Sequence, residues 1–436
     1  MHRARAWRRR IAVRSRTLVQ RVARRMPWYA PDTYLEGRNL RNLYAETVWF
    51  GVLSGLTATF VPVFALRLGA TAGQLGWLMA LPALVNVVWL IPAARLIERQ
   101  PHRLPVIITT GTLQRIGYLL LALVPLLAVT RRIELLIAVN TLITLPAAVA
   151  STAMTSLLPD LAAPERRHQI VSARWLILGA TSTFAALVGG WFLDLLPVPI
   201  NYQLLLGVGA LLSFLSLRYL RRIRVPDAVR LARTVEPGRR YAWRRLRASI
   251  ASVRGHRAFL RFSAASFVFY WGLHLPAALW SLFRVRDLGA SDTMIGVIAV
   301  AVDAATIAGY LWWGRTGARR GDRWLLLVTA LGVTGYAGVT ALVPSIGWMV
   351  PTSLFGGLMW AGCNLALFNV MLAVAPAERR PTYVALYAAL MNVSAAAAPL
   401  LGTALSGWVG IRWAFVIAAV VRLVGVGLFW RLVPKA

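Results

Sequence analysis

A five-residue segment that occurs twice decides the fold. Residues 67–71 read Arg-Leu-Gly-Ala-Thr, and residues 287–291 read Asp-Leu-Gly-Ala-Ser, 220 positions later. Two further segments recur in the same order: residues 94–103 match residues 314–323, again 220 positions apart, and residues 165–167 match residues 378–380, 213 positions apart. Three ordered matches at nearly one spacing indicate that the chain is a duplicated unit.

The composition predicts that both copies lie in a membrane. Of 436 residues, 58% are hydrophobic and only 14% are charged, and the mean hydropathy is +0.63. A soluble domain is about 45–50% apolar and about 25% charged. These values therefore argue against a water-soluble protein.

Long apolar segments alternate with short polar connections, and each is close to the ~20 residues that cross a bilayer. We expect an all-α integral membrane protein with twelve spans in two six-helix halves, residues 42–220 and 258–432, related by a pseudo-twofold axis. A tail (1–41), a basic linker (221–257) and a short end (433–436) complete the chain. The expected spans are 42–66, 74–96, 104–128, 133–157, 170–193, 200–220, 258–283, 291–314, 324–344, 346–374, 382–407 and 411–432.

The arginines predict the orientation. Alternating the spans places 39 basic residues on the side of both termini and six in the loops of the opposite side. Basic residues favour the cytoplasmic side, so we expect both termini in the cytoplasm and the protein in the cell membrane. The Arg-rich tail and linker suit anionic lipids of the inner leaflet, at about 1 kcal/mol per basic residue. A topology anchor without further function is the simpler alternative, and no nucleic acid is expected as a partner.

The duplicated layout and one connecting loop resemble major facilitator superfamily transporters. That family carries a Gly-x-x-x-Asp-Arg-x-Gly-Arg-Arg loop after its second and eighth spans. The resemblance implies that both copies act as conformational latches, although Ala318 stands at the acidic position of the second copy. The corresponding residues are Glu98, Arg99 and Arg103 in the first copy, and Gly314, Arg319, Gly321 and Arg323 in the second.

Charged side chains inside the spans are the first candidates for function, because a charge in the bilayer is costly. Of fifteen acidic residues, only Glu46 and Asp303 fall clearly inside spans. Asp303 lies about twelve residues from one end of its span, hence about 18 Å deep. A carboxyl near the midplane is suited to binding a coupling proton. The alternative is an aspartate held by a structural partner or a local water.

The resemblance implies that spans 1, 4, 7 and 10 line a central cavity. Each of these spans carries polar or aromatic side chains on one helical face. Hydrogen bonds between helices are the structural alternative for any one of these stripes. We expect His274 to lie within about two helical turns of Asp303. The cavity candidates are Ser54 and Glu46, Asn140 and Thr144, Ser266, Tyr270 and His274, and Trp360 and Asn364, with Asp303 on span 8.

Two features of the first half are expected to be structural. Arg115 lies in the middle of span 3 and needs a partner, for which Glu46 is the best candidate in a buried ion pair. Small residues at 185–190 in span 5 allow another helix to approach closely.

These observations predict a secondary active transporter that works by alternating access and is coupled to protons. The expected cavity is nearly free of charge, which favours a small neutral or weakly basic, partly apolar solute, with efflux of a drug or metabolite as the default. A lipid flippase or a non-transporting sensor on the same fold is the alternative. A polytopic membrane enzyme is less favoured, because it needs clustered acids or histidines in loops. One cysteine and five scattered histidines give no metal-ligand spacing, and no cofactor is expected.

Overall fold

The computed structural model describes residues 34–98, 100, 102–127, 130–158, 161, 167–224, 255–376 and 380–433. These residues contain twelve helices long and apolar enough to cross a membrane. The first half consists of α2 (Tyr34–Arg67), α3 (Ala72–Glu98), α4 (Arg103–Leu127), α5 (Arg132–Leu157), α6 (Arg167–Leu193) and α7 (Ile200–Leu220). The second consists of α10 (Arg257–His274), α11 (Leu279–Leu282), η3 (Phe283–Asp287), α12 (Asp292–Arg320), α13 (Asp322–Leu342), η4 (Ile346–Trp348), α14 (Met349–Val374), α15 (Arg380–Val409) and α16 (Ile411–Leu432).

The first helix is longer than expected. The sequence predicted a span from residue 42, but α2 begins at Tyr34. The amide of Asn39 donates to the carbonyl of Arg224 (2.8 Å) and accepts from its N–H (3.0 Å). This side chain therefore ties the early turns of α2 to the chain that leaves α7. The expectations for the Arg-rich tail and the linker otherwise concern residues that lie outside the described ranges.

Span 7 is broken, whereas one continuous helix was expected. Proline lacks an N–H and clashes with the carbonyl four residues earlier, and Pro276 therefore ends the regular helix near His274. The carbonyl of Gly272, which Pro276 cannot bond, accepts a hydrogen bond from Arg422 Nε instead (2.9 Å). After the break the chain continues as α11 and a π-helical turn, η3.

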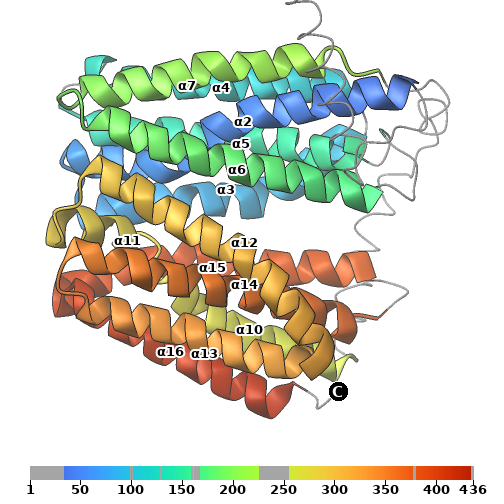
Figure 1. The fold of residues 1–436 in the computed structure, drawn as a ribbon, viewed down its shortest axis with the longest axis vertical. Helices are drawn as coiled ribbons and strands as arrows, with labels where there is room; N and C mark the ends of the chain where they lie inside the picture. The colour runs from blue at the N-terminus through green and yellow to red at the C-terminus, as the bar shows by residue number, and fades with distance from the viewer. Residues whose placement is uncertain are drawn as a thin grey trace, which may run out of the picture.

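Figure 1 shows the two halves as an upper and a lower group of helices, and the helices pack in the same pattern in both. In the first half, α2 packs on α6 and α7, α3 on α5, and α4 on α5 and α7. In the second, α10 packs on α15 and α16, α12 on α14, and α13 on α14 and α16. Between the halves, α3 packs on α15 and α6 on α12, and a pseudo-twofold axis exchanges these two pairs. The repeated segments of the sequence thus correspond to a repeated fold.

The halves approach most closely at one end of the bundle. We call the end at which α2 ends and α3 begins the far side, and the end at which α2 begins and α16 ends the terminal side. A Cβ atom on Gly190 of α6 would lie 2.4 Å from the carbonyl oxygen of Asp292, and one on Gly296 of α12 would lie 2.7 Å from that of Ala186. The two backbones are therefore nearly in contact near the far side, as the small residues of span 5 predicted.

Candidate functional site

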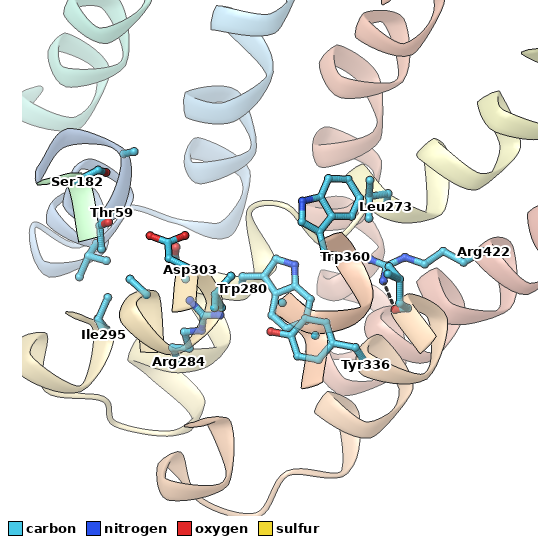
Figure 2. A pocket seen from close by; sticks show the side chains of 18 residues that line it. Thr59, Ser182, Leu273, Trp280, Arg284, Ile295, Asp303, Tyr336, Trp360 and Arg422 are labelled. Carbon is cyan, nitrogen blue, oxygen red and sulfur yellow. Dashed lines mark hydrogen bonds between the residues drawn. The ribbon is translucent and has the colours of Figure 1, made fainter. Parts of the chain in front are cut away.

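A cavity of about 480 Å³ lies between the two halves (Figure 2). The first half contributes small or hydroxyl-bearing side chains from α2 and α6, namely Ala58, Thr59, Val63 and Ser182. The second half contributes the aromatic and charged groups, from α11, η3, α12, α13, α14 and α16. The two walls thus differ sharply in chemical character.

Asp303 lines this cavity and connects the halves. Its Oδ2 accepts a hydrogen bond from Thr183 Oγ1 on α6, at 2.5 Å. Asp303 is the only carboxyl among the lining residues. A change in the protonation of Asp303 would therefore directly alter the contact between α6 and α12.

An aromatic surface forms part of the opposite wall. Trp280 stacks on Tyr336 with ring centroids 4.8 Å apart and planes at 10°. Trp360, a sequence candidate, lines the same cavity. Figure 2 shows the stacked pair near the centre of the view, with Trp360 beside it. This surface suits a flat apolar body.

Two arginines line the cavity, so the expectation of a nearly charge-free site is wrong. The guanidinium of Arg284 lies over the ring of Trp280, 5.7 Å from its centroid, and its buried Nε makes no hydrogen bond. Arg422 is only 1% exposed and donates from Nε to Gly272 and from Nη1 to the carbonyl of Val333 (both 2.9 Å). Within the described ranges, no carboxylate forms an ion pair with either arginine.

The sequence interpretation missed these arginines for different reasons. Arg284 and Trp280 reach the cavity because the chain breaks at Pro276, and the interpretation treated this region as a helix followed by an outer loop. Arg422, in contrast, carried a usable signal: it is a charge inside the apolar run of residues 411–432.

The polar stripe of span 7 packs inside the second half and not on a wall of the central cavity. His274 Nδ1 lies 2.9 Å from Ser394 Oγ on α15, and its ring lies 5.4 Å from that of Tyr270. Ser266 is fully buried. Asp303 accepts a hydrogen bond from Thr183, whereas His274 lies beside Ser394. His274 and Asp303, which were expected to be neighbours, thus have different partners.

The other candidates on spans 1, 4 and 10 are not among the residues that line the cavity of about 480 Å³, apart from Trp360. Ser54, Asn140 and Thr144 are half-buried, and Thr144 Oγ1 donates to the carbonyl of Asn140 (3.2 Å). Asn364 Nδ2 donates to Tyr310 Oη (2.8 Å) within the second half. Asp303 and Trp360 are thus the sequence candidates that the structure brings together.

Glu46 and Arg115 line a second cavity, of about 260 Å³, inside the first half. The ion pair expected between Arg115 and Glu46 is not formed; Glu46 pairs with Arg174 instead, at 3.8 Å. Arg115, 2% exposed, donates to the carbonyls of Ser213 (3.0 Å) and Gly111 (2.8 Å) and to Ser216 Oγ (2.5 Å). Backbone and hydroxyl oxygens satisfy its donors without a carboxylate.

The repeated Gly-Ala segments form reciprocal contacts across the halves. Arg67 donates to the carbonyl of Ala290 (2.7 Å) and pairs with Asp292 (3.2 Å), while Arg286 donates to the carbonyl of Ala70. Ala70 and Ala290 are equivalent positions of the two repeats. We call this set of contacts the far-side clamp.

Asp194 completes the far-side clamp. Its carboxylate accepts from the backbone N–H groups of Asp292 (3.0 Å) and Thr293 (2.9 Å), in the first turn of α12. Burial acts to raise the pKa of Asp194, but hydrogen bonds from Thr293, Asp292 and Ser291 outweigh burial and lower the pKa below its ordinary value.

The latch loops lie at the terminal side. α3 ends at Glu98, whose side chain, like Arg99, lies outside the described part of the chain. Arg103 donates to the carbonyl of Ser156, and Arg323 to that of Trp430 (2.6 Å), each within its own half. Gly314 lies in α12, Arg319 is exposed in its last turn, and Gly321 joins α12 to α13 at φ +83°. The latch role stays a prediction.

Comparison with known proteins decides the family. The family model of the Major Facilitator Superfamily matches residues 47–280 and 262–436. The chain belongs to this superfamily. No curated protein matches this chain.

Three similar solved structures agree with the fold of this superfamily member. A bacterial homologue of the human lysosomal transporter Spinster, in an inward-facing and unoccupied conformation, has 14% identity and a TM-score of 0.70, covering 92% of this chain and 98% of its own. A D-xylose–proton symporter has 12% identity and a TM-score of 0.68, covering 91% and 98%. The nucleoside transporter NupG has 13% identity and a TM-score of 0.69, covering 91% and 100%. At these identities the likeness shows the fold alone.

Within the described ranges, no group of three or more His, Cys, Asp or Glu side chains is arranged to hold a metal ion.

Proposed function

We propose that this superfamily member is a secondary active transporter that works by alternating access, with Asp303 as its proton-binding group. The observation that carries the proposal is the Asp303–Thr183 hydrogen bond, because it joins the two halves at the wall of the central cavity. A proton on Asp303 alters this contact, so proton binding and the arrangement of the halves influence each other.

The conformation supports the same proposal. The far-side clamp and the α6–α12 crossing hold the halves together at the far side. On the positive-inside rule the terminal side faces the cytoplasm, so this arrangement is closed toward the outside. Rocking of the two halves about the cavity would exchange it for an outward-open state.

The cavity also supports a small, partly apolar solute, because aromatic side chains form much of one wall. Efflux of a drug or metabolite stays our prediction for the direction of transport. Binding of the Arg-rich tail and linker to anionic lipids also stays a prediction.

Proton flux in proteoliposomes tests the proposal. Liposomes that contain the full chain and an internal pH dye are challenged with a panel of small anionic, neutral and cationic aromatic solutes. We expect at least one solute to move protons, and we expect Asp303→Asn to abolish this flux. Glu134→Gln, which removes an exposed carboxylate bonded to Gln74, is the matched control.

The outcomes separate the candidate functions. Solute uptake that persists in Asp303→Asn with an unchanged dependence on the pH gradient would remove Asp303 from the mechanism. Movement of labelled phospholipid between leaflets, without flux of any solute, would favour the flippase alternative instead.

A further inference from the structure

The distribution of charge in the central cavity identifies a class of solute. We propose that the cavity binds an organic anion with a flat apolar body, whose carboxylate is held by Arg284. This proposal rests on the proposed transport function and specifies the solute of the same site. It also replaces the neutral or weakly basic solute expected from the sequence.

Arg284 carries a buried donor that lacks an acceptor. Its guanidinium lies over Trp280, and its Nε is buried without a hydrogen-bond acceptor. A buried donor without an acceptor is unfavourable, so an acceptor supplied by a bound solute would be stabilising. A carboxylate fits best, because its two oxygens match the planar fork of a guanidinium.

The balance of charge favours an anion over a cation. The lining residues include two guanidinium groups, Arg284 and Arg422, but one carboxyl, Asp303. Arg422 is fixed by the carbonyls of Gly272 and Val333, which satisfy donors but do not neutralise its charge. The cavity is therefore positive when Asp303 is ionised and more positive when Asp303 carries a proton. This positive charge would repel a basic solute.

The aromatic surface of Trp280 and Tyr336 can bind the apolar body of the solute. Trp280 is in contact with both Arg284 and Tyr336, so the anion site continues directly into a stacked aromatic pair. Figure 2 places Arg284 and Asp303 on one side of this pair and Arg422 with Trp360 on the other. A ring that extends from the carboxylate would thus lie against the stacked pair.

The two halves would hold different parts of such a solute. All charged lining residues come from the second half, whereas the first half offers small side chains without charge, including Ala58 and Val63 and the hydroxyl groups of Thr59 and Ser182. The head group is then fixed to the second half, and the first half closes over the apolar body.

Calorimetry on the purified full-length protein tests this inference with three probes that share one ring system. These are 2-naphthylacetate, 2-naphthylacetamide and 2-(2-naphthyl)ethylamine, which are anionic, neutral and cationic. We expect the acid to bind about tenfold more tightly than the amide, since a hydrogen bond between charged partners is worth more than a neutral one, and the amine to bind most weakly.

Variants then locate the head group. Arg284→Gln should weaken binding of the acid about tenfold and binding of the amide much less. Asp303→Asn should strengthen binding of the acid, because it removes the only opposing charge. Arg412→Gln is the matched control: Arg412 also lies over an aromatic ring (Phe283, 5.3 Å) and donates to a carbonyl (Ala341, 2.8 Å), but it is exposed and does not line the cavity.

Three results would overturn the inference: an amine that binds as tightly as the acid, an acid affinity that Arg284→Gln leaves unchanged, or no binding of the acid. This experiment needs no gradient, so its outcome is independent of the transport assay. Proton flux driven by the amine would support the proposed transport function and contradict the proposed anion site. Tight binding of the acid without any proton flux would support the anion site and contradict the proposed transport function.

Discussion

The two arginines that are buried within the described ranges, Arg115 and Arg422, donate to backbone carbonyls and form no ion pair with a carboxylate. Arg115 and Arg422 each donate to two carbonyls from different elements. Burial of an unpaired charge is costly, and carbonyl dipoles reduce that cost without adding a second charge. For Arg422 the need is mutual, because Pro276 leaves the carbonyl of Gly272 without its helical partner.

Removal of Arg422 should therefore destabilise the second half. In Arg422→Met the carbonyl of Gly272 loses its donor, and we expect a loss of about 2 kcal/mol or more of stability. Thermal unfolding in detergent measures the effect, with the exposed Arg412→Met as the control. Equal unfolding temperatures for the two variants would contradict the bracing role of Arg422.

Glu46 should be coupled to Arg174 more strongly than to Arg115. The structure shows an ion pair only with Arg174, at 3.8 Å. In double-mutant cycles with Glu46→Gln, we expect a coupling of about 0.5–1 kcal/mol for Arg174→Gln and a smaller one for Arg115→Gln. The reverse order would restore the pair that the sequence predicted.

At this scale the sequence identified isolated charges but not their partners. Asp303 is conspicuous because it interrupts an apolar helix, and it does line the cavity. Its partner Thr183 lies on another helix, and only the packing of α6 on α12 brings the two together. His274 illustrates the opposite case: the correct helix was identified, but the face that carries His274 packs on α15.

Among the elements, helix ends and crossings decide which side of the molecule is closed. The far-side clamp joins the ends of α2 and η3 to the repeated Gly-Ala segments. Its contacts are reciprocal because the segments are copies of each other. The repeat was visible in the sequence, but the contact between its copies was not, because arginines in short loops were interpreted only as indicators of topology.

Loss of the Arg67 contact should open the far side. In a cysteine-free Cys363→Ala background, Ser281→Cys places a thiol on the cavity wall. With Arg67→Gln we expect a membrane-impermeant maleimide applied at the far side to label it about threefold faster or more. Arg131→Gln, which removes an exposed arginine at the same side, should leave the rate unchanged. Equal rates for both variants would mean that the clamp does not hold the halves together.

The contact of Asp194 with the start of α12 should make a pH-dependent contribution to stability. Its pKa is lowered by hydrogen bonds to the start of α12, so the stabilisation is present at neutral pH and is lost as the pH falls through the lowered pKa. We expect Asp194→Asn to lower the unfolding temperature at pH 7, because an amide oxygen accepts these hydrogen bonds more weakly than a carboxylate does. The difference in unfolding temperature from the unmodified protein should vanish in stronger acid. A difference independent of pH would argue against this role of the Asp194 carboxylate.

For the whole molecule, hydrophobic length and the internal repeat were sufficient to predict the architecture. Twelve helices were expected and are present in the described chain, and the packing pattern repeats between the halves. This worked because the bilayer imposes helix length and orientation. The cavity was harder to predict, since helix rotation and the break at Pro276 decide which side chains face it.

Alternating access requires the two halves to move against each other as units. Electron–electron distance measurements test it with two spin-label pairs in the Cys363→Ala background: Arg132→Cys with Ser345→Cys at the far side, and Gln169→Cys with Ala318→Cys at the terminal side. All four positions are exposed, and each pair joins the two halves.

Gly190→Leu, which blocks the α6–α12 crossing, drives the change, and Gly179→Leu on the same helix, in open space, is the control. The account predicts that Gly190→Leu lengthens the far-side distance and shortens the terminal-side distance, while Gly179→Leu changes neither. A far-side distance that lengthens while the terminal-side distance stays fixed or lengthens too would contradict alternating access.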